Sequence, residues 1–497
     1  MPCPADPCME FSNQPTITNQ RDKRMRTKIV ATLGPASMDQ GIMKEMVQLG
    51  VRVFRLNFSH ADAEYFGPVI QKIRQVEKDT GISLTVMGDL CGPKIRIGEV
   101  KGSPLQIRKG AYVCLGTPEM AATKESDIFI SLDVPELLDG LEAGMPVSLS
   151  DGMLQFRVIK VIERDRLVLL EALNGGILTS NKGIAFPGKT LKVAAMTDKD
   201  RRDLQQGLDI GIDAVALSFV QSKEDIEDIK AEIARHGTWI PVVAKVERRN
   251  AVDTLDSILE VADAIMVARG DLGLECSPAE LPIIQKKILR ACRHAQKPAI
   301  VATQMLLSMV KNPIPTRAES TDVSNAMIDG ADCVMLSEET AIGSYPVEAV
   351  RFINEIAQYS EPYYLERLGG PYVPKAEKNP PKFIAYSACL MADNADSVAL
   401  VCHSTTGATA RYISSRRPAQ PIYAMTTDAR IMRWMNFFWA ITPVESPLEP
   451  RSHQKRAEKF VQEYAGFRPG ENVIIASGQA TPGMGTVMTN EIKVYYK

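Results

Sequence analysis

The chain has 497 residues, 45% hydrophobic and 24% charged, which is typical of a soluble globular protein with roughly two to four domains. Its formal net charge of −2 does not indicate a basic surface that would bind nucleic acid or an acidic membrane. No apolar run is long enough to span a bilayer. Nine scattered cysteines without a CxxC pair indicate reduced thiols, so we expect a cytoplasmic protein with neither nucleic-acid nor membrane partners. Residues 1–20 are predicted to be a disordered lead-in.

Residues 21–92 alternate strand-like and helical patterns. Three short apolar runs, Lys28–Leu33, Val51–Asn57 and Leu84–Asp89, are separated by segments with helical spacing. Strands that alternate with helices favour parallel βαβ units. We therefore predict that this part opens a parallel sheet.

The pattern changes in residues 93–192, which contain strand-length runs and turn signals with little helical periodicity. Val147–Ser150 and Leu154–Ile162 flank the pair Asp151-Gly152, an arrangement that predicts a hairpin. A β-rich domain is therefore expected to interrupt the alternating pattern.

The alternation resumes in residues 193–368 with five more strand-and-helix units. Together with the three earlier strands they make eight, which matches the size and period of a (β/α)8 TIM barrel. The five additional predicted strands are Ala214–Phe219, Val242–Lys245, Ala264–Ala268, Ala299–Thr303 and Cys333–Leu336.

The rest of the chain is predicted to form a separate α/β domain. Residues 369–381 are rich in proline, glycine and lysine and indicate a linker, and residues 382–497 again alternate strands with helices. The expected architecture is thus a barrel, an inserted β-rich domain and a C-terminal α/β domain.

Polar side chains gather at the carboxyl ends of the predicted barrel strands. Because barrel enzymes keep their active sites on that face, their convergence predicts an active site rather than simple strand capping. These residues are Arg55, Asn57, Ser59, Asp89, Ser218, Lys245, Glu247, Arg269, Asp271, Thr303 and Ser337.

Glu247 and Asp271 are the candidate ligands of a divalent cation, since Mg²⁺ favours a few carboxylates together with water and substrate oxygens. Lys245 has two catalytic interpretations: neutralising a transferring phosphoryl group, or forming a Schiff base with a carbonyl substrate. A plain salt bridge to Glu247 is the structural alternative. Gly270 lets the backbone approach closely, so its N–H and that of Asp271 could hold a carboxylate or phosphate.

Two further groups of residues offer ligands. Asn57, Ser59 and Asp89 carry oxygens suited to a cation, although an Asn-x-Ser pair also caps turns. The loop Ser404–Thr409 lies between a strand and a helix and could bind a phosphate or merely cap the helix. The sequence contains neither a Walker loop nor a dinucleotide fingerprint.

Several segments in the right order make the chain resemble the pyruvate kinase family from about Arg26 to the C-terminus. They include T-K-I-V-A-T-L-G-P-A-S, R-L-N-F-S-H, G-P-K-I-R, K-V-E, M-V-A-R-G-D-L-G, A-T-Q-M-L and M-L-S-E-E-T-A-x-G-x-Y-P. The resemblance implies a barrel with a lid domain and a C-terminal regulatory domain. It also implies transfer of the phosphoryl group of phosphoenolpyruvate to ADP, giving pyruvate and ATP.

The resemblance assigns roles to matching positions. Lys245 and Arg55 would bind the phosphoryl group, Glu247 and Asp271 would hold Mg²⁺ or Mn²⁺, and Gly270, Asp271 and Thr303 would hold the substrate carboxylate. Thr303 and Ser337 would relay a proton to the enolate through water. The remaining assignments are nucleotide contacts at Asn57, His60, Arg96 and Lys182, a K⁺ site at Asn57, Ser59, Asp89 and the Leu90 carbonyl, and an effector-phosphate loop at Ser404, Thr405, Thr406, Gly407, Ala408 and Thr409.

Two departures from the family pattern carry predictions. This chain reads D-L-C-G-P-K-I-R where many members read D-T-K-G-P-E-I-R, so Lys94 could supply the charge of K⁺ and remove the K⁺ requirement. The segment G-Q-A-T-P-G-M-G-T lacks the tryptophan and arginine of some members activated by fructose 1,6-bisphosphate. We expect activation by a sugar monophosphate or nucleotide monophosphate as readily as by the bisphosphate.

Two other functions stay open at this point. A metal-dependent barrel aldolase or lyase would use Lys245 as a Schiff base but leaves the inserted domain unexplained. A non-catalytic, ligand-sensing relative would not need the intact set Lys245, Glu247, Asp271 and Thr303. The segment P-T-R-A-E at Arg317 matches a subunit contact of the family, so the resemblance implies a homotetramer.

Overall fold

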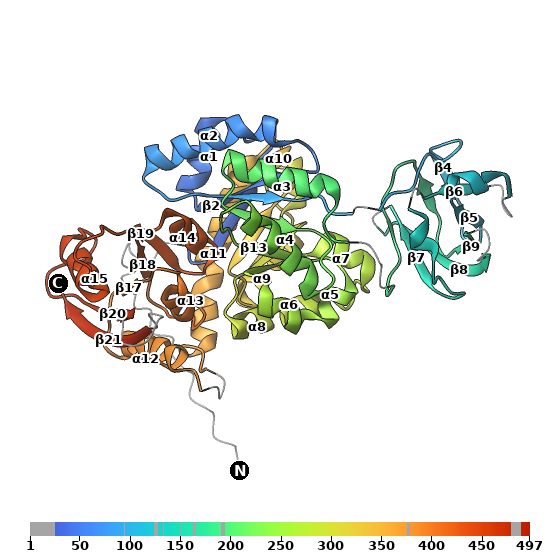
Figure 1. Ribbon diagram of the computed structural model, residues 1–497. Coiled ribbons are helices and arrows are strands. Elements are labelled where there is room, and N and C mark those ends of the chain that lie inside the picture. Colours follow the sequence, from blue (N-terminus) through green and yellow to red (C-terminus); the bar gives the residue numbers. More distant parts are fainter. Residues whose placement is uncertain are drawn as a thin grey trace, which may run out of the picture.

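The computed structural model describes residues 25–93, 95–123, 128–132, 134–150, 152–162, 166–189, 194–374, 378–478 and 489–497. The predicted lead-in, residues 1–20, lies outside these ranges, as do Lys94 and Asp151. In Figure 1 the inserted domain and the C-terminal domain lie at opposite ends of a central barrel.

Eight parallel strands close into a barrel in the order β1-β16-β15-β14-β13-β12-β3-β2, which confirms the predicted (β/α)8 fold. Each strand is a short, largely buried apolar run, as a sheet covered by helices on one side and filled with side chains on the other requires. Their bounds are β1 Lys28–Thr32, β2 Val51–Asn57, β3 Thr85–Asp89, β12 Ala214–Leu217, β13 Val242–Val246, β14 Ala264–Ala268, β15 Ala299–Ala302 and β16 Cys333–Leu336.

Amphipathic helices cover the outside of the barrel. Thr197 caps one of them, as the sequence pattern predicts: its hydroxyl accepts from the Asp200 N–H and closes a capping box. The helices are α1 Gln40–Gln48, α2 Ala63–Thr80, α3 Asp198–Ile210, α4 Lys223–Arg235, α5 Arg249–Asp253, α6 Leu255–Val261, α7 Arg269–Glu275, α8 Leu281–Ala295, α9 Arg317–Ile328, α10 Glu338–Ala341 and α11 Pro346–Leu368.

Two helices differ from the sequence-based expectation. The sequence pattern predicts one helix over Ala251–Glu260, but the structure divides it into α5 and α6 at Thr254, whose hydroxyl donates to the carbonyls of Asn250 (2.8 Å) and Gln221 (2.9 Å). The pattern also predicts a helix over Pro346–Ser360, whereas helix α11 continues through Pro362 to Leu368. Buried Glu361 accounts for this extension in part, because it accepts from the N–H groups of Arg26 and Thr27.

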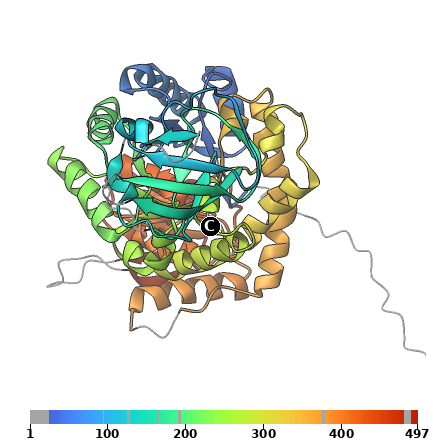
Figure 2. The same ribbon diagram turned by 90° about the vertical axis from the view of Figure 1, so that its right-hand side faces the viewer.

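The inserted region is β-rich, as predicted, and has its own core. A six-stranded sheet runs in the order β11-β7-β8-β9-β5-β6 beside the pair β10-β4, and β7 and β8 form the expected antiparallel hairpin. Figure 2 shows this domain in front of one end of the barrel. The strands are β4 Leu105–Ile107, β5 Tyr112–Gly116, β6 Phe129–Ser131, β7 Pro146–Leu149, β8 Leu154–Ile162, β9 Leu167–Ala172, β10 Gly176–Leu178 and β11 Ile184–Ala185.

The C-terminal domain is a five-stranded sheet, β19-β18-β17-β20-β21, with helices packed against it. Edge strand β19 was not expected from the sequence, because Pro443 interrupts its apolar pattern; proline is tolerated at a sheet edge. The elements are α12 Pro380–Asn394, β17 Leu400–His403, α13 Ala408–Ser414, β18 Ile422–Thr426, α14 Ala429–Trp434, β19 Ile441–Glu445, α15 His453–Glu463, β20 Asn472–Gly478 and β21 Thr489–Tyr496.

One buried cluster joins the interior of the barrel to the C-terminal domain. Interior residues such as Val30, Met87 and Met335 belong to the same apolar core as Phe437 and Trp439 of the C-terminal domain. The two parts therefore share a core.

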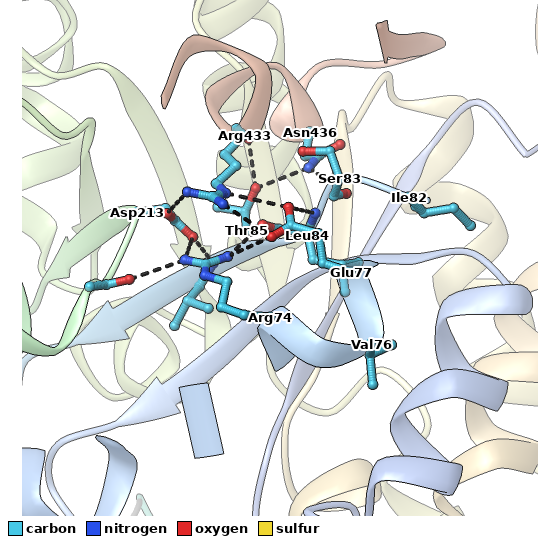
Figure 3. A network of polar contacts seen from close by, with 12 residues as sticks. Arg74, Val76, Glu77, Ile82, Ser83, Leu84, Thr85, Asp213, Arg433 and Asn436 are labelled. Carbon is cyan, nitrogen blue, oxygen red and sulfur yellow. Dashed lines mark hydrogen bonds and ion pairs between the residues drawn. The ribbon is translucent and has the colours of Figure 1, made fainter. Parts of the chain in front are cut away.

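Polar contacts reinforce the same interface around Arg433 of α14 (Figure 3). Its guanidinium lies 3.1 Å from Glu77 of α2 and 3.3 Å from Asp213, which also pairs with Arg74 at 2.6 Å. The Thr85 hydroxyl donates to the Arg433 carbonyl at 2.6 Å. This network joins α14 to the amino ends of β3 and β12, whose opposite ends carry Asp89 and lead to Ser218.

No helix in the described part of the chain is both long enough and apolar enough to cross a membrane.

Candidate functional site

Lys245 lies at the centre of a buried polar cluster at the carboxyl end of the barrel. Strand β13 delivers its Nζ to within 2.9 Å of Glu247 Oε1, 3.2 Å of Asp89 Oδ1 and 2.6 Å of the Ser218 hydroxyl. The salt bridge considered from the sequence is therefore present, but it is one of three contacts. Ser218 in turn donates to the Leu90 carbonyl at 2.7 Å.

The carboxylates of Asp89 and Glu247 keep Lys245 in its charged form. Burial alone would lower the pKa of Lys245, but Asp89 and Glu247 outweigh burial and raise that pKa above its ordinary value. Burial likewise disfavours ionised Asp89, yet Lys245 and Arg55 lower its pKa. The site therefore holds a permanently protonated ammonium beside an ionised Asp89.

Arg55 extends this cluster from strand β2. Its Nε donates to Asp89 Oδ2 at 2.6 Å, and its Nη1 donates to the Thr32 hydroxyl at 3.0 Å. Asp89 thus lies between two cations, Arg55 and Lys245, which face the same end of the barrel. This arrangement suits an anionic ligand rich in oxygen.

The expected monovalent-cation ligands already have partners within the protein. Asp89 pairs with Arg55, Leu90 O accepts from Ser218, and Asn57 Oδ1 accepts from the Ser59 N–H at 3.1 Å. Lys94, the expected substitute for K⁺, lies outside the described residues.

The segment Arg269–Asp271 begins helix α7 directly after strand β14. The Gly270 N–H, expected to hold a carboxylate, donates to the Thr303 hydroxyl at 2.9 Å, and that hydroxyl donates to the Ala302 carbonyl at 2.6 Å. A ligand carboxylate would have to share or replace this contact. Thr303 has φ +70°, a strained backbone at the strand end that directs it toward Gly270.

Arg269 positions this turn through contacts that the sequence did not indicate. Its Nη1 donates to both carboxylate oxygens of Asp322 on α9, at 2.8 and 2.6 Å, and its Nη2 donates to the Thr303 carbonyl at 2.7 Å. Ser337 occupies the N-cap position of the short helix α10, and its backbone N–H donates to the Glu339 carboxylate at 2.7 Å. No hydrogen bond joins Thr303 to Ser337 in the described structure, so a relay between them would need water.

Glu247 and Asp271 line one cavity between the barrel and the inserted domain. Burial raises the pKa of Glu247, and the nearby Asp271 raises it further, while Lys245 opposes the shift. Two neighbouring carboxylates fit a divalent cation whose remaining ligands are water and substrate oxygens. No cluster of three or more His, Cys, Asp or Glu side chains with metal-ligand geometry occurs within the described ranges.

The expected nucleotide contacts are divided between the two domains. Asn57 ends barrel strand β2 and exposed His60 follows it, whereas Arg96 and Lys182 are exposed on the inserted domain. The Arg96 guanidinium donates to the Asn181 carbonyl at 3.0 Å, and Arg96 pairs with Gly183 in a β-bridge. The two exposed cations therefore lie on neighbouring segments.

The loop Ser404–Thr409 lines a pocket in the C-terminal domain, together with His403, His453 and Tyr412. Arg456 donates to His403 Nε2 at 3.0 Å, and the two histidine rings lie 4.3 Å apart. Nδ1 of buried His403 has no hydrogen-bond partner among the described residues. With Nε2 accepting from Arg456, Nδ1 carries the proton of neutral His403 and is available to an acceptor.

The closed barrel with a cation-and-carboxylate centre at the carboxyl ends of its strands defines a barrel enzyme built for anionic substrates. Comparison with known proteins narrows this class. Residues 24–350 match the family model "Pyruvate kinase, barrel domain", and residues 382–495 match "Pyruvate kinase, alpha/beta domain".

Individual relatives agree with the family models. The chain is 39% identical to pyruvate kinase 2 of Synechocystis sp. over 94% of this chain and 79% of that protein. It is 38% identical to a pyruvate kinase of Agrobacterium vitis over 94% and 96%, and 36% identical to that of Thermococcus litoralis over 95% and 98%. The chain belongs to the pyruvate kinase family and is a phosphotransferase of that type.

Proposed function

We propose that the protein transfers the phosphoryl group of phosphoenolpyruvate to ADP, giving pyruvate and ATP in the last step of glycolysis. The observation that carries this proposal is the protonated lysine of the barrel centre, held between Asp89 and Glu247 beside Arg55. Phosphoryl transfer needs positioned positive charge around the moving group. Lys245 and Arg55 supply it from two neighbouring parts of the strand-end face.

The remaining residues fit supporting roles in this reaction. Glu247 and Asp271 would hold Mg²⁺ or Mn²⁺, which when bound would supply positive charge to offset the negative charge of the reacting groups. Gly270, Asp271 and Thr303 would orient the substrate carboxylate. Thr303 and Ser337 would pass a proton to the enolate through water, because a threonine hydroxyl alone is a weak acid. Asn57, His60, Arg96 and Lys182 would bind ADP, and closure of the inserted domain as a lid would exclude water.

The Schiff-base alternative is disfavoured by the charge of Lys245. An amine must lose its proton to attack a carbonyl, whereas Asp89 and Glu247 raise the pKa of this amine. Borohydride added with pyruvate should therefore leave activity unchanged and produce no reduced adduct by intact-mass measurement. A stable adduct on Lys245 would contradict phosphoryl transfer and favour a lyase.

We propose that activity has little K⁺ dependence, with the ammonium of Lys94 in place of the ion. Steady-state rates in buffers of tetramethylammonium salts should change less than about twofold when KCl is added. The Lys94→Glu variant should regain a K⁺ requirement, because it restores an acidic residue and removes the resident charge. Strong activation of the wild type by KCl would refute this prediction.

We propose that the loop Ser404–Thr409 binds the phosphate of a sugar phosphate or nucleotide monophosphate effector. Its hydroxyls and the available Nδ1–H of His403 are donors for phosphate oxygens. A Cβ placed on Gly407 would lie 3.6 Å from Ile431 and 3.6 Å from Met435, so the loop lies close against α14 and the turn after it. Arg433 of that helix contacts Asp213 and Glu77 of the barrel, which offers a route for coupling.

An effector is expected to lower the half-saturating concentration of phosphoenolpyruvate by about fivefold or more, the range of a typical coupling free energy. Ribose 5-phosphate, glucose 6-phosphate, AMP and fructose 1,6-bisphosphate should be compared in saturation curves. His403→Ala should abolish this decrease in the half-saturating concentration. The saturation curve measured without an effector should stay the same as that of the wild type. If none of the four compounds shifts the wild-type curve, the regulatory role is wrong.

Of two remaining assignments, the oligomeric state rests on the family resemblance and the location rests on cysteine usage. We propose a homotetramer with Arg317, exposed at the start of α9, at a subunit contact, and a cytoplasmic location.

A further inference from the structure

Arg248 is a buried arginine with two guanidinium nitrogens that lack hydrogen-bond partners in the described structure. It follows Glu247 directly and precedes helix α5. Only 5% of the residue is exposed, and its Nε and Nη1 are buried without a hydrogen-bond partner in the described structure. A guanidinium with unmet donors is costly to bury, so such a group signals a missing acceptor.

The groups around Arg248 favour its charged form but do not provide acceptors for its unpaired N–H groups. Its carbon Cζ lies 5.2 Å from the centre of the Phe219 ring, an aromatic face that attracts a cation but accepts no conventional hydrogen bond. Burial lowers the pKa of Arg248, while Glu275 and Glu247 oppose that shift by charge alone. Arginine stays protonated at neutral pH in any case.

The cavity that Arg248 lines identifies the kind of ligand. Its barrel wall contains the carboxylates Glu247, Asp271 and Glu275, and its other wall contains Gly183, Ile184 and Ala185 of the inserted domain. Burial raises the pKa of Glu275 to about 7, and the Gly188 backbone of the inserted domain hydrogen bonds to it. The cavity therefore lies where the two domains meet.

The wall of this cavity that the inserted domain forms is next to two proposed nucleotide contacts. Gly183 follows Lys182 in the chain and pairs with Arg96, and both cations are proposed nucleotide contacts. Among the proposed contacts of phosphoenolpyruvate, Asp271 lines the cavity, where it is also a proposed ligand of the divalent cation, whereas Arg55, Lys245, Gly270 and Thr303 are not among the described lining residues. The wall formed by the inserted domain therefore lies next to the proposed nucleotide contacts, which favours the nucleotide as the source of an anionic oxygen entering here.

We propose that Arg248 binds a phosphate oxygen of the nucleoside diphosphate and is a specificity-determining residue for that substrate. The inference rests on the proposed transfer from phosphoenolpyruvate to ADP. The Arg248 donors meet the diphosphate from the barrel side, and the cations of the inserted domain meet it from the other side. Neutralising the nearby carboxylates with a bound divalent cation removes the repulsion that they would exert on the diphosphate.

Kinetics of Arg248→Gln test the proposal, with Arg249→Gln as the matched control. Arg249 is the adjacent residue, but its side chain is 40% exposed and pairs with Asp253 at 3.2 Å. Arg248→Gln should raise the KM for ADP about tenfold or more, the effect of losing a hydrogen bond to a charged group, and the KM for phosphoenolpyruvate less than about twofold. Arg249→Gln should change neither constant, and Arg248→Lys should recover part of the ADP affinity.

Direct binding separates a lost contact from a damaged fold. Titration calorimetry with MgADP in the absence of phosphoenolpyruvate should show weaker binding by Arg248→Gln at a thermal unfolding midpoint close to that of the wild type. An unchanged KM for ADP in an active variant, or a rise confined to phosphoenolpyruvate, would overturn the proposal. An inactive wild-type protein would instead refute the proposed function itself, so the two failures are distinguishable.

Discussion

Replacing Lys245 by methionine should reduce kcat/KM for phosphoenolpyruvate by about 10³-fold or more. The buried ammonium pairs with both Asp89, at 3.2 Å, and Glu247, at 2.9 Å, at the end of β13. Removing one preorganised charge at a reacting centre typically costs about 10²- to 10³-fold in rate, and here it also leaves two carboxylates to repel the phosphate. Steady-state pyruvate formation measures the effect.

The same variant should be less stable, which requires a control. Asp89 and Glu247 would stay buried without the lysine, a loss of about 3–5 kcal/mol in the free energy of unfolding for a broken buried pair. Circular dichroism must therefore show that the variant is folded under the conditions of the activity assay. Lys230→Met removes a lysine that pairs with Asp263 at 2.9 Å on the outside of the barrel, and should retain nearly full activity. Comparable rates for wild type and Lys245→Met would contradict the assigned role.

Glu247→Gln is the second substitution with a large expected effect. It keeps the shape of the side chain but removes one of the two carboxylates proposed to bind the divalent cation, so Mn²⁺ should bind at least about tenfold more weakly. Enhancement of water proton relaxation during a Mn²⁺ titration measures this affinity without any turnover.

Glu280→Gln is a suitable comparison for that titration. Glu280 is 55% exposed and pairs with Arg249 at 3.4 Å, so its loss should leave Mn²⁺ binding unchanged. The metal assignment fails if Glu247→Gln binds Mn²⁺ as tightly as Glu280→Gln.

The barrel could be predicted because its strands are short, largely apolar runs that end in or lead to polar residues. Strands β2, β14 and β16 have the bounds expected from the sequence. The carboxyl ends of barrel strands lie on one face whatever the conformation of the loops. For this reason the sequence predicted that Lys245, Asp89, Arg55 and Glu247 lie close together. Their mutual distances bear out this convergence.

Contacts between residues far apart in the chain could not be predicted from the sequence pattern. Asp322 lies on an ordinary helix, and nothing local indicates that it holds Arg269. Ser218 was expected at a strand end, but its bonds to Lys245 and Leu90 depend on the register of three strands. The unpaired donors of Arg248 could be recognised only in the structure, because they depend on how deeply the side chain is buried. Its position next to Glu247 was the one feature of the sequence that pointed to this residue.

The most direct test of the account is the stoichiometry of the wild-type reaction. Purified protein with phosphoenolpyruvate, ADP and Mg²⁺ should form pyruvate and ATP in equal amounts, with no pyruvate when ADP is omitted. Pyruvate released at the same rate without ADP, or no ATP formed at any substrate concentration, would contradict phosphoryl transfer at the Lys245 centre.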